Sequence, residues 1–244
     1  MIYHRVTSGR AWDWTVYGWR LFIRDPGVWI VLYLVYLVIE YGLPLVPTAG
    51  PLVLSFIAPA LTAGLLFAAR EQDCGRPIHV DQLFRAFRDR SVVGRVLVLG
   101  LIGLGFKLVS IAVGVASLGG ALVAVLTGRL AASALIPALA LGGTFGLLVA
   151  VTLGLVLAML LYYAVPLVMF DAAHPIEAVK SSVAACTVNI LPLTVLSLIN
   201  VGLYLVAMLS LGVGIVVVGP ITIGSMYAGY KEIYGLSEGA DGRV

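Results

Sequence analysis

Charged side chains are scarce in this sequence. Only 11% of its 244 residues are Asp, Glu, Lys or Arg, whereas 61% are hydrophobic. A soluble domain carries about 25% charged and about 45–50% apolar residues. The composition therefore argues against a soluble fold and a disordered chain, and a net charge of only +3 gives no basis for nucleic-acid binding. We expect an all-α, polytopic transmembrane helical bundle.

Cysteine and histidine are also rare. Cys74 and Cys186 belong to no CxxC motif or Cys/His cluster, so no metal site is predicted. The histidines, His4, His79 and His174, all fall outside the predicted spans, which argues against a haem held between membrane helices. The HExxH, Walker A and GxSxG patterns are missing as well. We expect neither a cofactor nor enzymatic activity.

Long apolar runs make up most of the chain. A bilayer core of about 30 Å needs about 20 helical residues. Six spans are predicted, at residues 28–46, 51–69, 96–114, 146–166, 190–209 and 212–230. Residues 130–170 carry no charge at all, so region 115–145 has three interpretations. It could add two further spans, form a re-entrant segment or extend outside the membrane.

The basic residues are sorted along the chain. If the N-terminus is cytoplasmic, every Lys and Arg lies in a cytoplasmic segment except Arg129, in an outer connection, and Lys107, inside a span. Such an excess of positive charge marks the cytoplasmic side of a membrane. We therefore predict a multi-pass protein of the bacterial inner membrane with both termini in the cytoplasm.

Each predicted pair of spans follows an amphipathic stretch. The apolar stripes have helical spacing and consist of Trp14, Tyr17, Gly18 and Leu21; of Val80, Leu83, Phe84 and Phe87; and of Ile176, Val179, Val183 and Cys186. At the entrance to a span, such helices are expected to lie in the membrane interface. We predict a single domain with a threefold repeat of interfacial helix and hairpin, in units of about 11–69, 79–166 and 175–230.

Small residues form a ladder on the fourth predicted span. Gly142, Gly146, Ala150, Gly154 and Ala158 follow one another at intervals of four. Small side chains let membrane helices approach closely. We predict that this face packs against another helix of the same chain, with an oligomer contact as the alternative.

Three polar residues fall within the predicted spans. Glu40, Lys107 and Asn200 occupy the first span of each unit at similar depth. Charges inside a membrane mark candidate functional sites and need partners. One hypothesis is a buried Glu40–Lys107 pair with Asn200 nearby. The alternative is that Glu40 lies at the outer headgroups and that Lys107 extends outward to them.

Three segments carry a family resemblance. GWRLFIRDPGVWIVL at 18–32, LSFIAPALTAGLLFAAR at 54–70 and VPLVMFDAAHPIEAVKSSVAACTVNILP at 165–192 resemble an uncharacterised family of proteobacterial six-span inner-membrane proteins. More remotely, they resemble the membrane domain fused to some glycerophosphodiester phosphodiesterases. The resemblance covers most of the chain outside 115–145 and implies a fold and a location. It implies no catalytic residue.

Three functional hypotheses follow. The first is a non-catalytic accessory or scaffold protein that contacts lipids or another membrane complex, with a mild attraction to anionic headgroups. The second is a small transporter or channel that uses Glu40, Lys107 and Asn200. The third and weakest is a lipid-modifying enzyme, for which only Asp171, His174 and Glu177 offer candidates. Transport requires a cavity that reaches Glu40 or Lys107, whereas a scaffold is expected to be a closed bundle.

Overall fold

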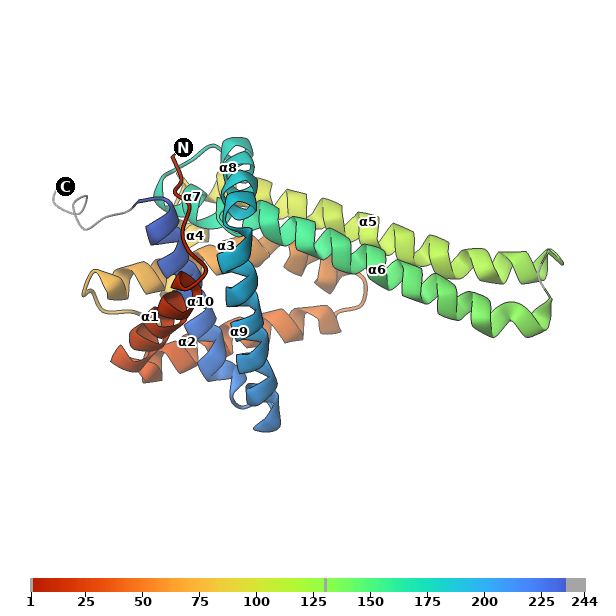
Figure 1. Cartoon of the computed structure of the whole chain (residues 1–244), viewed down its shortest axis with the longest axis horizontal. Helices are drawn as coiled ribbons and strands as arrows, with labels where there is room; N and C mark the ends of the chain where they lie inside the picture. The colour runs from red at the N-terminus through yellow and green to blue at the C-terminus, as the bar shows by residue number, and fades with distance from the viewer. Residues whose placement is uncertain (1, 130, 236–244) are drawn as a thin grey trace.

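The computed structural model describes residues 2–129 and 131–235, and within these ranges the chain is helical without strands. The α-helices are α1 (Arg10–Arg24), α2 (Pro26–Gly42), α3 (Ala49–Asp73), α4 (Arg85–Arg88), α5 (Val93–Leu126), α6 (Leu135–Leu161), α7 (Ala164–Phe170), α8 (Pro175–Val188), α9 (Ile190–Leu209) and α10 (Ile215–Ile233). The 3-10 turns are η1 (Leu43–Leu45), η2 (Val80–Phe84) and η3 (Ala132–Ala134). Figure 1 shows a compact base from which the α5–α6 hairpin projects.

Five described helical segments are long and apolar enough to cross a membrane. They are Pro26–Leu45, Ala49–Asp73, Val93–Leu126, Leu135–Phe170 and Ile190–Leu209. The sixth predicted span, 212–230, includes most of α10, which lies largely buried in the base and carries Lys231 and Glu232 in its last turn. In Figure 1, α9 and α10 run across the long axis of the α5–α6 hairpin. The structure therefore supports a membrane protein with five candidate spans.

The α5–α6 hairpin is longer than a bilayer is thick. With 34 residues, α5 is about 51 Å long, compared with about 30 Å for a hydrocarbon core. Region 115–145 continues α5 and α6 on either side of the turn and adds no separate pair of helices. No described residue of α6 is fully buried, although one of its faces packs on α5. The structure therefore gives no separate pair of helices in this region, and its place relative to the membrane stays a prediction.

The base is built around α1 and α10. Trp14, Gly18 and Leu21, three members of the first predicted stripe, are buried. This face packs on α10, and the location of α1 in the membrane interface stays a prediction. Gly18 allows the close contact, because a Cβ added there would lie 2.2 Å from the backbone oxygen of Ile221.

The second and third amphipathic stretches also pack on the base. The second is the turn η2 followed by the short helix α4, and its Leu83 is fully buried against α3. In α8, Ile176 of the predicted stripe is 56% exposed, whereas Ala178, Ser182 and Ala185 are buried. The order of short helix and hairpin recurs three times, but the hairpins differ in length and direction, so the repeat stays a prediction.

A buried serine supports the break between α6 and α7. The Ser182 hydroxyl donates to the Met159 backbone oxygen at 2.8 Å and accepts from the Tyr163 backbone N–H at 3.0 Å. Ser182 thus provides hydrogen-bond partners for backbone groups at the point where the helix is interrupted. As a result, the fourth predicted span, 146–166, is divided between α6 and α7.

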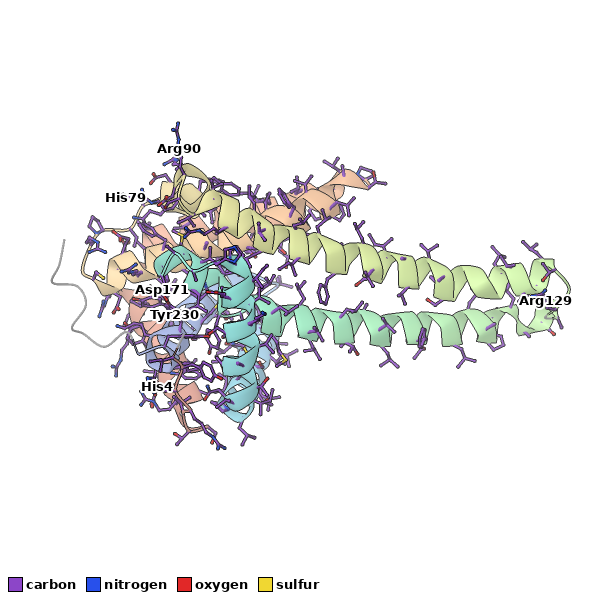
Figure 2. The ribbon with its side chains drawn as sticks, turned by 90° about the horizontal axis from the view of Figure 1, so that it is seen from above. His4, His79, Arg90, Arg129, Asp171 and Tyr230 are labelled. Carbon is purple, nitrogen blue, oxygen red and sulfur yellow. The ribbon has the colours of Figure 1, made fainter. Side chains whose placement is uncertain are left out.

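The polar side chains gather at the base. Figure 2 shows His4, His79, Arg90 and Asp171 there, whereas Arg129 lies at the far tip of the hairpin. The His4 backbone N–H donates to the Ile233 oxygen at 2.7 Å, so the beginning of the described chain lies against the end of α10. Both ends of the described chain therefore lie on the same side of the fold.

Candidate functional site

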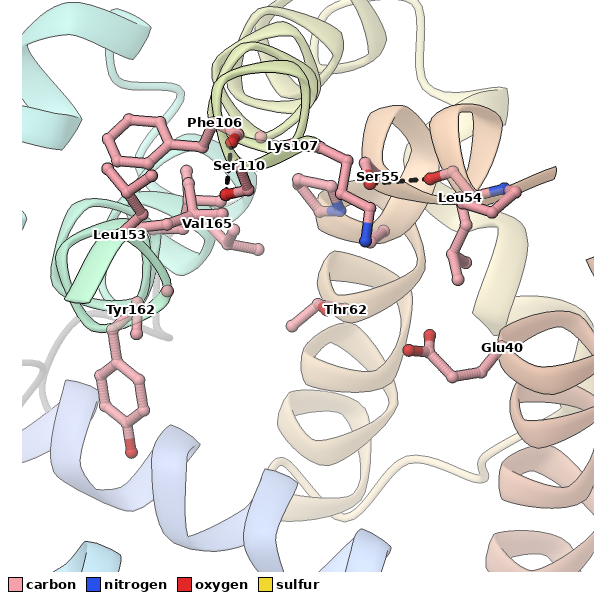
Figure 3. Close-up of a pocket in the computed structure, with 18 of the residues that line it drawn as sticks. Glu40, Leu54, Ser55, Thr62, Phe106, Lys107, Ser110, Leu153, Tyr162 and Val165 are labelled. Atoms are coloured by element: carbon pink, nitrogen blue, oxygen red, sulfur yellow. Dashed lines mark hydrogen bonds between the residues drawn. The ribbon is translucent and has the colours of Figure 1, made fainter. Parts of the chain in front are cut away.

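A cavity of about 710 Å³ opens between the α2–α3 and α5–α6 hairpins. Its wall includes residues from α2, α3, α5, α6, α7 and α10, and most of its surface is apolar, with Leu54, Phe106 and Leu153 among the contributors (Figure 3). Its volume lies within the about 300–1,000 Å³ that is typical of ligand pockets. The cavity lies among the candidate membrane spans rather than in the polar base.

Two glycines allow the helices that form the cavity walls to approach one another closely. A Cβ on Gly100 of α5 would lie 1.8 Å from the Phe56 oxygen of α3. A Cβ on Gly142 of α6 would lie 2.3 Å from the Ser117 oxygen of α5. These close approaches fix α5 against both neighbours, as is usual where small residues meet in membrane helices.

The predicted small-residue ladder has two roles along its length. Gly142 and Gly146 face Ser117 of α5, which is the packing contact expected within one chain. Ala150, Gly154 and Ala158 instead line the cavity, and a Cβ on Gly154 would have open space around it. The part of the ladder from Ala150 to Ala158 therefore leaves space for a ligand.

Glu40 projects into the cavity from α2 (Figure 3). Its Oε2 atom is buried and has no hydrogen-bond partner among the described residues. A buried carboxylate oxygen without a partner is unfavourable, since it has lost its contacts with water. The neighbouring Tyr36 hydroxyl shares a hydrogen bond with Glu40, but the Oε2 atom stays available to a bound group.

Lys107 reaches the same cavity from α5 (Figure 3). Glu40 lies 14 residues after Pro26 and Lys107 lies 14 residues after Val93, which places both about 21 Å along their helices. The two side chains share the cavity at similar depth, but no ion pair joins them in the described chain. The direct Glu40–Lys107 pair is therefore absent from this structure.

Asn200 lies elsewhere. It belongs to α9 and is not among the residues that line the cavity. Its Oδ1 atom is buried and has no partner among the described residues. The structure thus brings together two members of the predicted polar cluster and leaves out the third.

Hydroxyl groups are the cavity residues that sequence analysis missed. Ser55 and Ser110 line the wall, and each donates to a backbone oxygen of its own helix, Pro51 at 2.8 Å and Phe106 at 2.9 Å (Figure 3). Because those bonds use the hydroxyl hydrogens, the oxygens can still accept from a ligand. Single serines in apolar runs give little signal in a sequence.

The candidates for an enzyme do not converge. Asp171 accepts a hydrogen bond from the Tyr230 hydroxyl at 2.7 Å, while His174 and Glu177 are exposed at the beginning of α8. Within the described residues, no group of three His, Cys, Asp or Glu side chains could hold a metal ion. Asp171 has a structural partner and lies in the base, away from the cavity.

One comparison with known proteins gave a match. Residues 23–236 match the family described as a domain of unknown function, DUF7847. The chain belongs to the DUF7847 family. The match runs from the end of α1 past α10 and includes region 115–145, so the long hairpin and the cavity both lie within the DUF7847 domain. No curated protein and no solved structure matches the chain.

Proposed function

We propose that this DUF7847 protein is a non-catalytic protein of the bacterial inner membrane that holds a lipid-like ligand between its α2–α3 and α5–α6 hairpins. The observation that carries the proposal is the largely apolar cavity, which Glu40 and Lys107 enter from different helices. A closed scaffold was expected to have no such space. Apolar walls with a few polar groups are typical of sites for amphiphilic molecules.

The proposed topology has six spans, with α10 as the sixth and with both termini in the cytoplasm. Two observations support it. The basic residues are concentrated in segments that alternate with the candidate spans. The hydrogen bond between His4 and Ile233 ties both ends of the described chain together. In this topology α9 and α10 cross the membrane at a different tilt from the long hairpin.

The proposal that the cavity holds a ligand is tested by a substitution that fills the cavity. Gly154→Phe adds a ring where the structure has open space in the cavity wall, and Gly202→Phe adds the same ring on the outer surface of α9. Each variant is purified in mild detergent, and retained lipids are counted by native mass spectrometry. We expect Gly154→Phe to lose a tightly bound lipid that Gly202→Phe and the original protein retain. Equal lipid retention in all three would contradict the proposal.

Transport is the second candidate function, because the cavity reaches both Glu40 and Lys107. It is tested in proteoliposomes by measuring permeability to protons and monovalent ions. A flux that is lost in the folded Glu40→Gln/Lys107→Met variant supports transport. No flux above that of protein-free liposomes contradicts this candidate for those ions.

A further inference from the structure

The two cavity charges have opposite sign and lie apart. Glu40 extends from α2 and Lys107 extends from α5, with the cavity between them (Figure 3). The five ion pairs among the described residues, which join N and O atoms within 4.0 Å, include neither of them. A charge among membrane helices is costly unless it has a partner. A ligand in the space between these residues would therefore be stabilised by contacts with both charges.

A ligand with a single charge fits poorly. A cation attracted to Glu40 would enter the field of Lys107, and an anion attracted to Lys107 would enter the field of Glu40. The repulsion at Glu40 is strengthened by the low dielectric constant around its buried Oε2 atom, whereas Lys107 is more exposed. A wholly apolar ligand would leave the Glu40 Oε2 atom without a hydrogen-bond partner and both residues without an opposite charge. A molecule with a positive and a negative group gives both Glu40 and Lys107 a partner of opposite charge.

We propose that the cavity binds a zwitterion, with its ammonium group at the Glu40 carboxylate and its phosphate or carboxylate at the Lys107 ammonium. This inference rests on the proposed function, because it assumes that the cavity holds a ligand. Hydrogen bonds between charged groups are among the strong ones, so both contacts contribute to selectivity. The apolar part of the ligand lies against Phe106 and Leu153.

Two sources can supply this chemistry. A zwitterionic phospholipid such as phosphatidylethanolamine carries an ammonium and a phosphate in its headgroup, and a free amino acid carries an ammonium and a carboxylate. The depth of both charges, about 21 Å along their helices, is compatible with either source. The experiment therefore has one arm for each.

In the lipid arm, the protein is placed in nanodiscs of equal phosphatidylethanolamine and phosphatidylglycerol, and the lipids retained after extraction are quantified by native mass spectrometry. In the soluble arm, binding of radiolabelled phenylalanine is measured. We expect the original protein to favour phosphatidylethanolamine over phosphatidylglycerol, or to bind phenylalanine, and either result supports a zwitterion. Equal retention of the two lipids, or preference for phosphatidylglycerol, together with no binding of phenylalanine, would overturn the inference.

Charge variants test which residues recognise the ligand. Glu40→Gln and Lys107→Met each remove one contact and are expected to reduce the selectivity about tenfold, as loss of one charge-assisted bond implies. The double variant Glu40→Lys/Lys107→Glu exchanges the charges and is expected to restore binding in reverse orientation. The matched controls, Glu177→Gln and Lys180→Met on the exposed surface of α8, are expected to change nothing.

The outcomes separate this inference from the proposed function. If Gly154→Phe loses a bound lipid but the charge variants leave the lipid ratio unchanged, the cavity holds an amphiphile and the zwitterion inference is wrong. If Gly154→Phe also leaves lipid retention unchanged, the proposed function itself is wrong. Thermal unfolding of each variant confirms that a loss of binding reflects the cavity and not a failure to fold.

Discussion

Gly18 of α1 and Gly224 of α10 face each other where the two helices cross. A Cβ added to Gly224 would lie 2.6 Å from the Cα of Gly18, a distance that real Cβ atoms do not adopt. At this crossing, the face of α1 that carries Trp14 packs on α10, which is itself largely buried. The close approach of α1 and α10 therefore depends on two residues that have no side chain.

We expect Gly18→Ala to destabilise the protein. The new methyl group would meet the Ile221 oxygen, and overpacking of this kind costs about 1–3 kcal/mol. The matched control is Gly27→Ala on α2, where the added Cβ has open space. Thermal unfolding in detergent is expected to show a lower Tm for Gly18→Ala alone. The same Tm for both variants would mean that α1 and α10 are less closely packed than described.

Asp73 links three helices and provides a second test. It accepts hydrogen bonds from the Tyr17 hydroxyl of α1, from the Tyr227 hydroxyl of α10 at 3.0 Å, and from the Lys231 ammonium at 2.6 Å. We expect Asp73→Asn to lower the free energy of unfolding by about 2–3 kcal/mol, because it leaves half-buried donors poorly matched. Denaturant titration of the reconstituted protein measures this loss.

The control for Asp73 is an ion pair on the surface. Asp81 and Arg88 form a pair at 2.6 Å, and both side chains are more than half exposed. Exposed pairs contribute about 0–1 kcal/mol, so Asp81→Asn is expected to change stability little. If both variants lose the same free energy, the Asp73 network is no more important than a surface contact.

Cys186 offers a test that depends on pH. Burial raises the pKa of its thiol to about 11, although the Ser182 hydroxyl opposes the shift. Since the thiolate is the reactive form, maleimide labelling in a Cys74→Ser variant should be slow at pH 7.5 and should accelerate about tenfold per pH unit as pH rises towards 11. Unfolded protein, with an ordinary thiol pKa, is the control. Rapid labelling of the folded protein at pH 7.5 would contradict this prediction.

Hydropathy patterns predicted the elements that show a strong contrast between faces. Trp14 and Leu21 alternate with charged residues in α1, so the buried face was correctly predicted. The pattern could not tell what covers that face, because lipid and a second helix both favour apolar side chains. For this reason the pattern predicted that α1 has an apolar face but could not predict that this face packs on α10.

Hydropathy was less informative where small residues pack. In α8, the buried face contains Ala178, Ser182 and Ala185, which allow close contact and supply a hydrogen bond. Ile176 is more apolar than any of them and is exposed. The buried face of α8 is determined by close packing of small side chains and by hydrogen bonds to the backbone. A hydropathy scale measures neither.

Counting residues along each helix predicted that Glu40 and Lys107 lie at similar depth. The count could not show that a cavity separates them, because the cavity arises from contacts such as Gly100 with Phe56, which lie far apart in the sequence. Nor could it show the side of α9 on which Asn200 lies. Depth follows from helical rise, whereas direction depends on the packing of neighbouring helices.

Ser182 tests the interruption between α6 and α7. Ser182→Ala leaves the Tyr163 N–H without its acceptor and the Met159 oxygen without its donor. Losing such buried partners is expected to cost about 1–3 kcal/mol. Ser197→Ala is the control, since Ser197 is exposed and bonds only within its own helix. Hydrogen exchange at residues 159–163 should increase in Ser182→Ala alone. An unchanged exchange rate would show that the break needs no support from α8.

The last prediction concerns topology, because the sidedness of every helix depends on it. Ser8, Thr48 and Leu211 are exposed, before α1, in the turn between α2 and α3, and in the turn between α9 and α10. Each is changed to Cys in a Cys74→Ser background, and intact cells are treated with a thiol reagent that does not cross the membrane. The proposed six spans expose Cys at 48 and 211 to the reagent and protect Cys at 8, which reacts only after lysis. Labelling at 48 but not at 211 would contradict the proposed fifth and sixth spans, because it would leave the turn between α9 and α10 on the cytoplasmic side. Labelling at 8 in intact cells would instead reverse the orientation and place the base, with most of its arginines, outside the cell, against the charge distribution of the chain.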